Sequence, residues 1–187
     1  MVYLTQLWIP IVLSAVIVFV VSSILHMVLP LHKNDYRKLP YEEKVVDALR
    51  AAGLTPGPAY HFPHCASHKE MSSPEMVEKY KKGPLGFVTI LPSGPPNMLR
   101  FLGLWFDYCL IVGIFTAYLA GRTVAPGTDY LHVFRVAGTA AFMGYGLGHF
   151  VDSVWKGQTW GVTLKHMFDG LLYALLTAGT FGWLWPR

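Results

Sequence analysis

The hydrophobic positions of the chain form long uninterrupted runs, not an alternating pattern. The first run, residues 7–29, has 23 residues and only one titratable side chain, His26. As a helix it would extend ~35 Å at 1.5 Å per residue, which exceeds a ~30 Å hydrocarbon core. No basic side chain precedes the run, whereas Lys33, Arg37 and Lys38 follow it. This order predicts an uncleaved first membrane span and disfavours a signal peptide.

Three further apolar runs lie in the second half of the chain, at residues 101–119, 136–151 and 162–185. The first of these contains a single charge, Asp107, and the second must extend into the polar residues before it to reach membrane length. The short connection 152–160 favours an antiparallel hairpin between the last two runs. The pattern therefore predicts an all-α fold, an integral membrane four-helix bundle.

The segment between the first two runs is the one sizeable polar part of the chain. It predicts two short amphipathic helices, near 40–53 and 72–83, each with capping signals at its ends. We therefore expect a first span in residues 1–30, a loop in 31–98 and a three-span bundle in 99–187. A loop of this size buries little core alone, so we expect it to lie against the bilayer or the bundle.

The distribution of basic residues predicts the orientation. Most of the 15 Lys and Arg residues would lie on the side of loop 31–98, which should therefore be cytoplasmic, with both termini outside. Charged residues make up only 14% of the chain, against a usual ~25%, and the net charge is +4. This composition excludes a nucleic-acid-binding domain and makes the lipid bilayer the first expected partner.

Small residues recur at every fourth position in the last three runs, which places them along one face of each helix. They are Gly113, Ala117 and Gly121; Ala140, Gly144 and Gly148; and Gly170, Ala174, Ala178 and Gly182. Such stripes let helices approach closely in lipid. They predict packing within the bundle, against another membrane protein or against a second copy of the chain.

Two copies of one polar pattern extend these stripes: His149-x-x-Asp152 and His166-x-x-Asp169. Residues three apart are neighbours on a helix surface, so the imidazole and the carboxylate of each pair can share a site. Both pairs fall at the cytoplasmic level of the predicted bundle. Ionisable groups at this depth usually face protein or water.

Asp107 and His26 fall near the same level and are candidate additions to this group. Three interpretations remain open for it. The side chains can form structural hydrogen bonds between spans, bind a divalent transition metal through imidazole and carboxylate, or relay protons. Their spacing selects none of the three.

A second group of candidate ligands lies in the loop, at His61, His64, Cys65 and His68. Three imidazoles and a thiol within eight residues have the chemistry of a zinc or transition-metal site. No second ligand pair follows, however, as zinc modules usually require. A solvated loop with several histidines is the simpler interpretation.

The C-terminal segment KGQTWGVTLKHMFDGLLYALLTAGTFGWLW and the end of the first run, SSILHMVLPLHKNDYRKLP, together carry a resemblance. The chain resembles an uncharacterised family of small bacterial four-span membrane proteins of unknown function. The resemblance implies a bacterial inner membrane and four helices. It implies no reaction and no site residues.

No phosphate-binding loop, nucleophile elbow, His-Glu-x-x-His or haem-attachment motif occurs. The first functional hypothesis is therefore a multi-pass inner-membrane protein with a structural or accessory role and no enzymatic one. The alternative is a metal-binding or proton-relaying membrane enzyme or transporter that uses the His/Asp level of the bundle.

Overall fold

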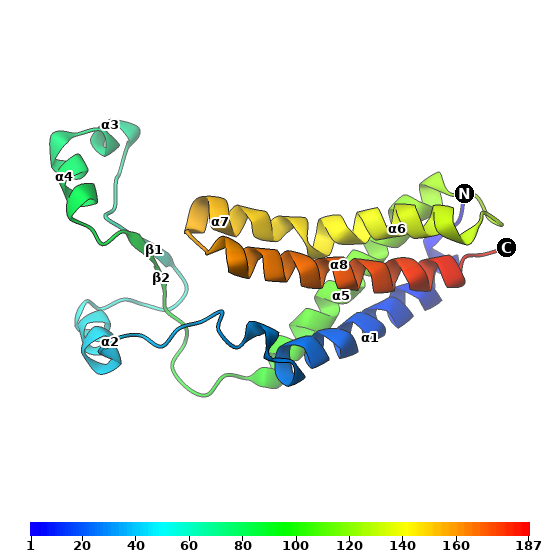
Figure 1. Ribbon diagram of the computed structural model, residues 1–187, viewed down its shortest axis with the longest axis horizontal. Helices are drawn as coiled ribbons and strands as arrows, with labels where there is room; N and C mark the ends of the chain where they lie inside the picture. The colour runs from blue at the N-terminus through cyan, green and yellow to red at the C-terminus, as the bar shows by residue number, and fades with distance from the viewer. The chain divides into compact units, whose positions relative to one another are not determined.

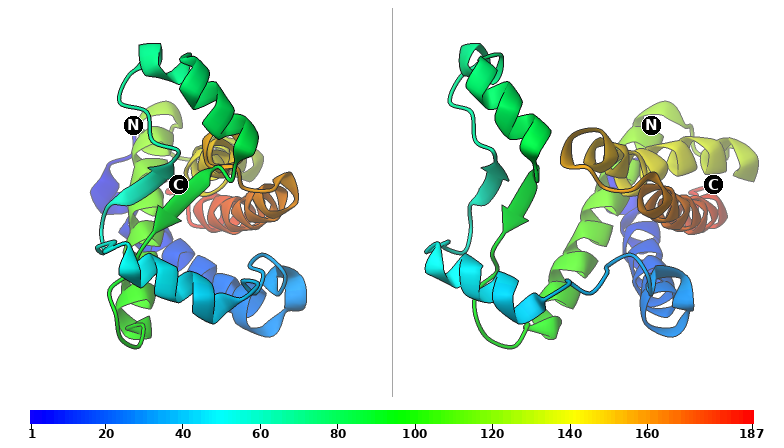
Figure 2. Two further views of the ribbon diagram at one scale, coloured as in Figure 1. Left: turned by 90° about the vertical axis from the view of Figure 1, so that its left-hand side faces the viewer. Right: turned by 60° about the vertical axis from the view of Figure 1, so that its left-hand side comes forward.

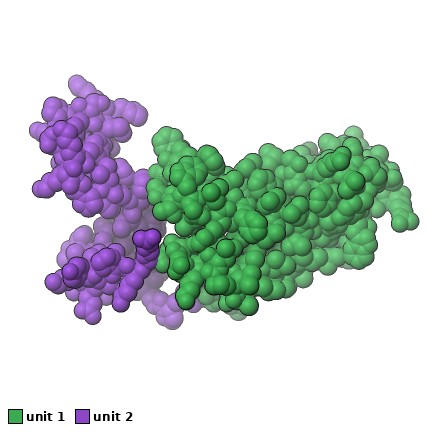
Figure 3. Space-filling view, viewed as in Figure 1, with its two compact units in different colours: residues 1–36, 97–187 green, residues 37–96 purple.

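The computed structural model describes all residues, 1–187, and the chain divides into two compact units. The first unit contains Met1–Tyr36 and Asn97–Arg187, and the second contains Arg37–Pro96 (Figure 3). The chain is mostly helical, as the sequence predicts. We call the first unit the helical unit and the second the loop unit.

The helical unit is built from four main helices and several short turns (Figure 1). The main helices are α1 (Trp8–Ser23), α5 (Met98–Thr123), α6 (Tyr130–Tyr145) and α8 (Trp160–Trp183). The short elements are η1 (Leu4–Gln6), the π-helical turn η2 (Ile24–Val28), η3 (Pro30–His32), η4 (Leu147–His149) and α7 (Phe150–Lys156).

The main helices pack in a connected set. Helices α6 and α8 run side by side, α1 contacts α5 and α8, and α5 also contacts α6 (Figures 1 and 2). One buried cluster of side chains joins these helices near the chain termini and includes Phe181 and Val133. A second cluster, which includes Cys109, Tyr145 and Tyr173, lies farther along the unit.

Several of the small residues in the predicted stripes lie where two helices meet. A Cβ added to Gly170 would lie 2.6 Å from the Cα of Gly146, so α8 and the end of α6 approach through backbone atoms. At Gly144 an added Cβ would lie 3.1 Å from the Val112 side chain. These glycines therefore serve packing within the helical unit.

Two helices are long and apolar enough to cross a membrane: Trp8–Val28, which is α1 continued through η2, and Met98–Thr123, which is α5. Helix α6 has 16 residues. Helix α8 has 24 residues but carries Lys165 and Asp169 in its first half. Helix length and composition alone therefore assign two candidate spans, and a four-span membrane bundle remains a prediction.

The loop unit contains α2 (Glu42–Ala51), α3 (His68–Met71), α4 (Pro74–Lys82) and two strands, β1 (Ala59–Phe62) and β2 (Gly86–Thr89). Helices α2 and α4 correspond to the two short helices predicted for the loop. The strands pair antiparallel, with Ala59 opposite Thr89 and Phe62 opposite Gly86 (Figure 2). The all-α prediction misses this two-stranded ladder, because its partners are far apart in the sequence and become neighbours only after folding.

Candidate metal centre

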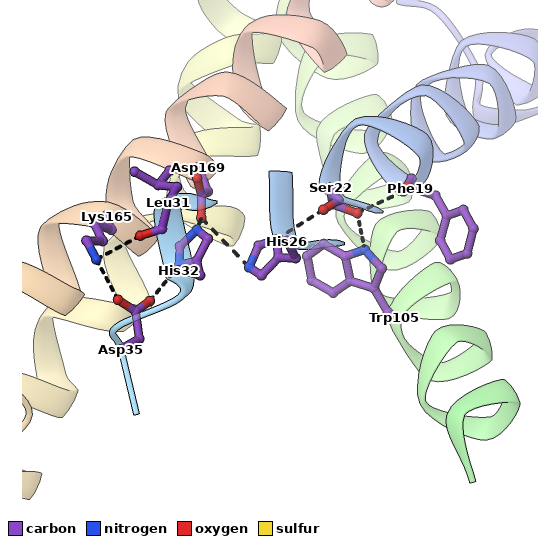
Figure 4. Close-up of polar contacts among 9 residues, drawn as sticks. All are labelled: Phe19, Ser22, His26, Leu31, His32, Asp35, Trp105, Lys165 and Asp169. Atoms are coloured by element: carbon purple, nitrogen blue, oxygen red, sulfur yellow. Dashed lines mark hydrogen bonds and ion pairs between the residues drawn. The ribbon is translucent and has the colours of Figure 1, made fainter. Parts of the chain in front are cut away.

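Four side chains of the helical unit converge on one point. Their candidate ligand atoms all lie within 4.8 Å of one another, and the exposed or half-buried imidazoles surround one buried carboxylate. The four residues, which we call the His–Asp cluster, are His26, His32, His166 and Asp169. They come from η2, η3 and α8, elements that are distant in sequence. Figure 4 shows three of them, His26, His32 and Asp169.

The end of the first apolar helix carries two of these imidazoles. The helix changes from α to π geometry at Ile24, and η2 carries His26. Pi-helical turns of this kind occur often at functional sites. Pro30 then begins η3, which ends at His32. On α8, the three-residue spacing of His166 and Asp169 places both on neighbouring positions of one helix surface.

The imidazole of His32 is held by a buried carboxylate outside the cluster. Nδ1 of His32 lies 2.6 Å from Oδ2 of Asp35, and a carboxylate can only accept this hydrogen bond. Nδ1 therefore carries the hydrogen, and in the neutral ring the lone pair lies on Nε2. An imidazole that donates its second nitrogen to a carboxylate is typical of metal ligands.

Asp35 is itself fixed by Lys165, whose Nζ lies 2.6 Å from Oδ1 of Asp35 and also donates to the backbone oxygen of Leu31 at 2.9 Å (Figure 4). Burial alone would raise the pKa of the Asp35 carboxyl, but the hydrogen bonds and positive charges of Lys165 and His32 together lower it. Asp35 is therefore ionised at neutral pH and continues to orient His32.

His26 is oriented in a similar way by the backbone. Its Nδ1 lies 3.0 Å from the carbonyl oxygen of Ser22, which can only accept a hydrogen bond. The Ser22 hydroxyl in turn accepts a hydrogen bond from Nε1 of Trp105 at 2.8 Å (Figure 4). Nε2 of His26 is left free toward the cluster, 3.9 Å from Oδ2 of Asp169.

Asp169 is the unsatisfied member of the group. Only 3% of its side chain is exposed, and neither of its carboxylate oxygens has a hydrogen-bond partner. Nε2 of His32 lies 2.8 Å from Oδ2, which is an ion-pair distance when that imidazole is protonated, but the contact lacks the geometry of a hydrogen bond. A buried carboxylate in this state costs several kcal/mol of folding free energy unless a cation or a proton neutralises it.

These donors fit a divalent transition metal ion. Two ligand atoms bound to one tetrahedral ion at ~2.0–2.1 Å lie about 3.3 Å apart, and the 2.8 Å and 3.9 Å separations from Oδ2 of Asp169 bracket this value. The cluster as a whole spans up to 4.8 Å, so its imidazoles would move inward on binding an ion. Three imidazoles and one carboxylate are a donor set that Zn²⁺ and other late first-row ions accept. The ion would supply the positive charge that the Asp169 carboxylate lacks.

A cavity of about 510 Å³ adjoins the cluster. Its polar end includes three of the four cluster residues and His149, and the remainder of its wall is mostly aromatic and aliphatic. The lining residues are Ser22, Ser23, His26, Met27, Met98, Leu102, Trp105, Tyr108, Tyr145, His149, His166, Asp169 and Tyr173. An ion in the cluster would therefore be in reach of a molecule in this cavity.

The candidates predicted for the bundle divide into two groups. His26, His166 and Asp169 belong to the cluster. His149 lies beside it, with its ring centroid 5.0 Å from that of His166, and lines the cavity.

Asp152 and Asp107 lie apart from the cluster. The Asp152 carboxylate pairs with Nζ of Lys156 at 2.7 Å. The Asp107 side chain is exposed on α5. The structure therefore brings together only some of the His and Asp side chains that were predicted to share this level.

The four loop candidates are not brought together. His61 lies on β1 with its ring 4.7 Å from that of Phe87, and Sγ of Cys65 lies 3.1 Å from the Tyr80 hydroxyl. His64 and His68 do not complete a group of three ligand atoms with them. The contacts favour a structural role for these side chains within the loop unit.

Sequence reasoning missed His32 and Asp35. Both were assigned to the loop, yet residues 31–36 belong to the helical unit. The signal that identifies them is a third copy of the same pattern, His32-x-x-Asp35, directly after the first apolar run.

Comparison with protein-family models, curated proteins and solved structures finds no match to this chain. The functional conclusion therefore depends on the geometry of the site.

Proposed function

We propose that the chain is a multi-pass inner-membrane protein that holds one divalent transition metal ion in the His–Asp cluster. The single observation that carries this proposal is the buried carboxylate of Asp169, which has no hydrogen-bond partner and is surrounded by three imidazoles. Ionisable side chains at membrane depth are functional more often than not.

The membrane assignment is supported by apolar surface. In the best 18-residue windows of the two candidate spans, only 33% and 17% of the residues are buried inside the protein. The core helix of a water-soluble protein would be mostly buried, whereas these helices expose large side chains such as Val16, Phe115 and Leu119. Lipid is the solvent that suits such faces.

Orientation and span number follow the sequence. Helices α6 and α8 are the third and fourth spans of the proposal, and the basic residues place loop 31–98 in the cytoplasm, with both termini outside. The His–Asp cluster then lies at the cytoplasmic end of the bundle.

The metal proposal is favoured over an accessory role because most glycines of the small-residue stripes already have partners, with Gly148 as the exception. Gly113 meets Ile11, Gly144 meets Val112 and Gly170 meets the backbone at Gly146, all within the same chain. An accessory protein that docked through these faces would need them free.

A proton relay is the second candidate, and it is favoured by one separate observation. Four imidazoles form a continuous row in which neighbouring ring centroids lie 5.0, 5.3 and 4.3 Å apart, in the order His149, His166, His32 and His26. Imidazoles change charge near neutral pH, so these rings could pass protons if water linked their nitrogens, because the stacked rings make no hydrogen bond to one another. Metal analysis separates the two functions, because the relay needs no ion.

The test is equilibrium binding of Zn²⁺ to the detergent-purified full chain. We expect one tightly bound ion per chain, and Asp169→Asn should weaken binding at least tenfold because it removes the only anionic ligand. Asp107→Asn is the matched control, since it removes an exposed carboxylate from α5 and should leave the affinity unchanged. Equal affinities for the two variants, or no bound ion, would rule out the metal site.

A further inference from the structure

The cavity beside the His–Asp cluster has a polar end and a larger apolar body. Its volume of about 510 Å³ lies within the ~300–1,000 Å³ range of small-molecule sites. The polar end consists of cluster residues and His149, and the body is lined by aromatic rings and by Met and Leu side chains. This division suits an amphipathic ligand whose head faces the cluster.

The net charge of the metal centre determines which ligand head group it can bind. A divalent ion with three neutral imidazoles and the Asp169 carboxylate keeps a net charge of about +1, because the other ligands are neutral. No Lys or Arg lines the cavity, so the ion would be its only strong positive charge. The side chain of His26 is 43% exposed, which leaves the centre less enclosed on its side. A singly charged oxygen ligand would neutralise the centre.

Tyr173 adds an independent observation. It lines the cavity and is 4% exposed, and its hydroxyl has no hydrogen-bond partner. It lies four residues after Asp169, on the same face of α8. By contrast, the hydroxyl of Tyr108, in the same wall, already donates to the carbonyl oxygen of Gly144 at 2.6 Å. Tyr173 is therefore the one hydroxyl in this wall without a hydrogen-bond partner in the chain.

We infer that this cavity binds a single-chain lipid carboxylate, a fatty acid or a close analogue. One carboxylate oxygen binds the metal ion as a fifth ligand beside the three imidazoles and Asp169, the other accepts a hydrogen bond from the Tyr173 hydroxyl once that side chain turns toward the ligand, and the acyl chain occupies the apolar body. A phosphate head would bring more negative charge than one ion and one hydroxyl can balance. This inference rests on the proposed metal site.

The experiment uses the full chain in nonionic detergent, loaded with Co²⁺ as a spectroscopic substitute for Zn²⁺. Sodium dodecanoate is titrated below its micelle concentration while the visible absorption of the bound Co²⁺ is recorded. Dodecan-1-ol, which has the chain without the carboxylate, and acetate, which has the carboxylate without the chain, are the matched ligands.

We expect dodecanoate to change the Co²⁺ spectrum with saturation at one ligand per chain, and neither control ligand to do so at the same concentration. Tyr173→Phe should weaken dodecanoate binding about tenfold, the loss of one charge-assisted hydrogen bond, with unchanged Co²⁺ affinity. Tyr130→Phe, at the opposite end of α6 from Tyr145, should bind dodecanoate like the parent protein.

Three results would overturn the inference while leaving the metal site intact: a Co²⁺ spectrum indifferent to dodecanoate, acetate as effective as dodecanoate, or Tyr173→Phe that binds dodecanoate unchanged. Failure of the protein to bind Co²⁺ at all would instead overturn the metal site and, with it, the inference that rests on it.

Discussion

At the scale of single residues, one sequence pattern has three different structural outcomes. In His166-x-x-Asp169 both side chains belong to the His–Asp cluster. In His32-x-x-Asp35 the carboxylate accepts a hydrogen bond from Nδ1 of the imidazole and so orients the ring. In His149-x-x-Asp152 the imidazole lines the cavity and the carboxylate pairs with Lys156. The sequence predicts that these residues can share a site, but the role of each carboxylate depends on the neighbouring element that it meets.

Asp35 is a positioning residue of the proposed centre. In Asp35→Asn the amide keeps an oxygen for Nδ1 of His32 but loses the negative charge and the ion pair with Lys165. We expect Zn²⁺ affinity to fall about 10–100-fold, as for other residues that orient metal-bound histidines, while one ion still binds at saturating Zn²⁺. Competition titration with a chromophoric chelator measures this.

The matched control is Asp47→Asn, whose parent carboxylate also pairs with a basic residue, Arg50, but in the exposed part of α2. It should bind Zn²⁺ with the parent affinity. A positioning role for Asp35 would be refuted by an Asp35→Asn protein with parent affinity, or by loss of the bound ion from both variants.

At the scale of elements, the apolar runs predict where the long helices lie, because burial or lipid contact requires a continuous apolar surface. They do not predict how a helix ends. The π-helical turn η2 and the short η3 together bring His26 and His32 to the cluster, where they meet His166 and Asp169 of α8, and no local pattern specifies that meeting. The β1–β2 ladder was missed for a related reason, since no local pattern encodes its pairing.

Gly170 provides a test of element packing. A methyl group there would lie 2.6 Å from the Cα of Gly146 and 2.7 Å from the carbonyl oxygen of Tyr145, and backbone atoms cannot easily move away. Gly170→Ala should therefore lower the free energy of unfolding by about 1–3 kcal/mol. Gly161→Ala, also in α8, meets no atom within 4 Å and should be neutral or slightly stabilising.

Thermal unfolding of both variants in the same detergent measures the difference. Equal melting temperatures for Gly170→Ala and Gly161→Ala would show that α8 and the end of α6 do not approach as closely as described.

At the scale of the whole molecule, the proposed membrane protein consists of a lipid-exposed helical unit and a polar loop unit. The orientation rests on the basic residues, and it predicts opposite accessibility for two introduced cysteines in a Cys65→Ser, Cys109→Ser background. In intact cells whose inner membrane is sealed, Arg187→Cys should react with a membrane-impermeant maleimide. Asp47→Cys in α2 should react only after permeabilisation.

The reverse pattern of labelling would invert the topology, and labelling of both cysteines or of neither in sealed cells would contradict an even number of spans. The reverse pattern would place the His–Asp cluster at the outer end of the bundle. Labelling of both cysteines or of neither would change the number of spans.

X-ray absorption at the zinc edge of the purified, zinc-loaded protein tests the central claim most directly, because it reports the ligands themselves. The account predicts about four nitrogen and oxygen neighbours at ~2.0 Å, with the outer-shell scattering of several imidazoles and no sulfur. His32→Ala should remove part of that imidazole signal, and His61→Ala should not. A sulfur neighbour at ~2.3 Å, which would place the ion at Cys65 or Cys109, or a spectrum unchanged by His32→Ala, would contradict the account.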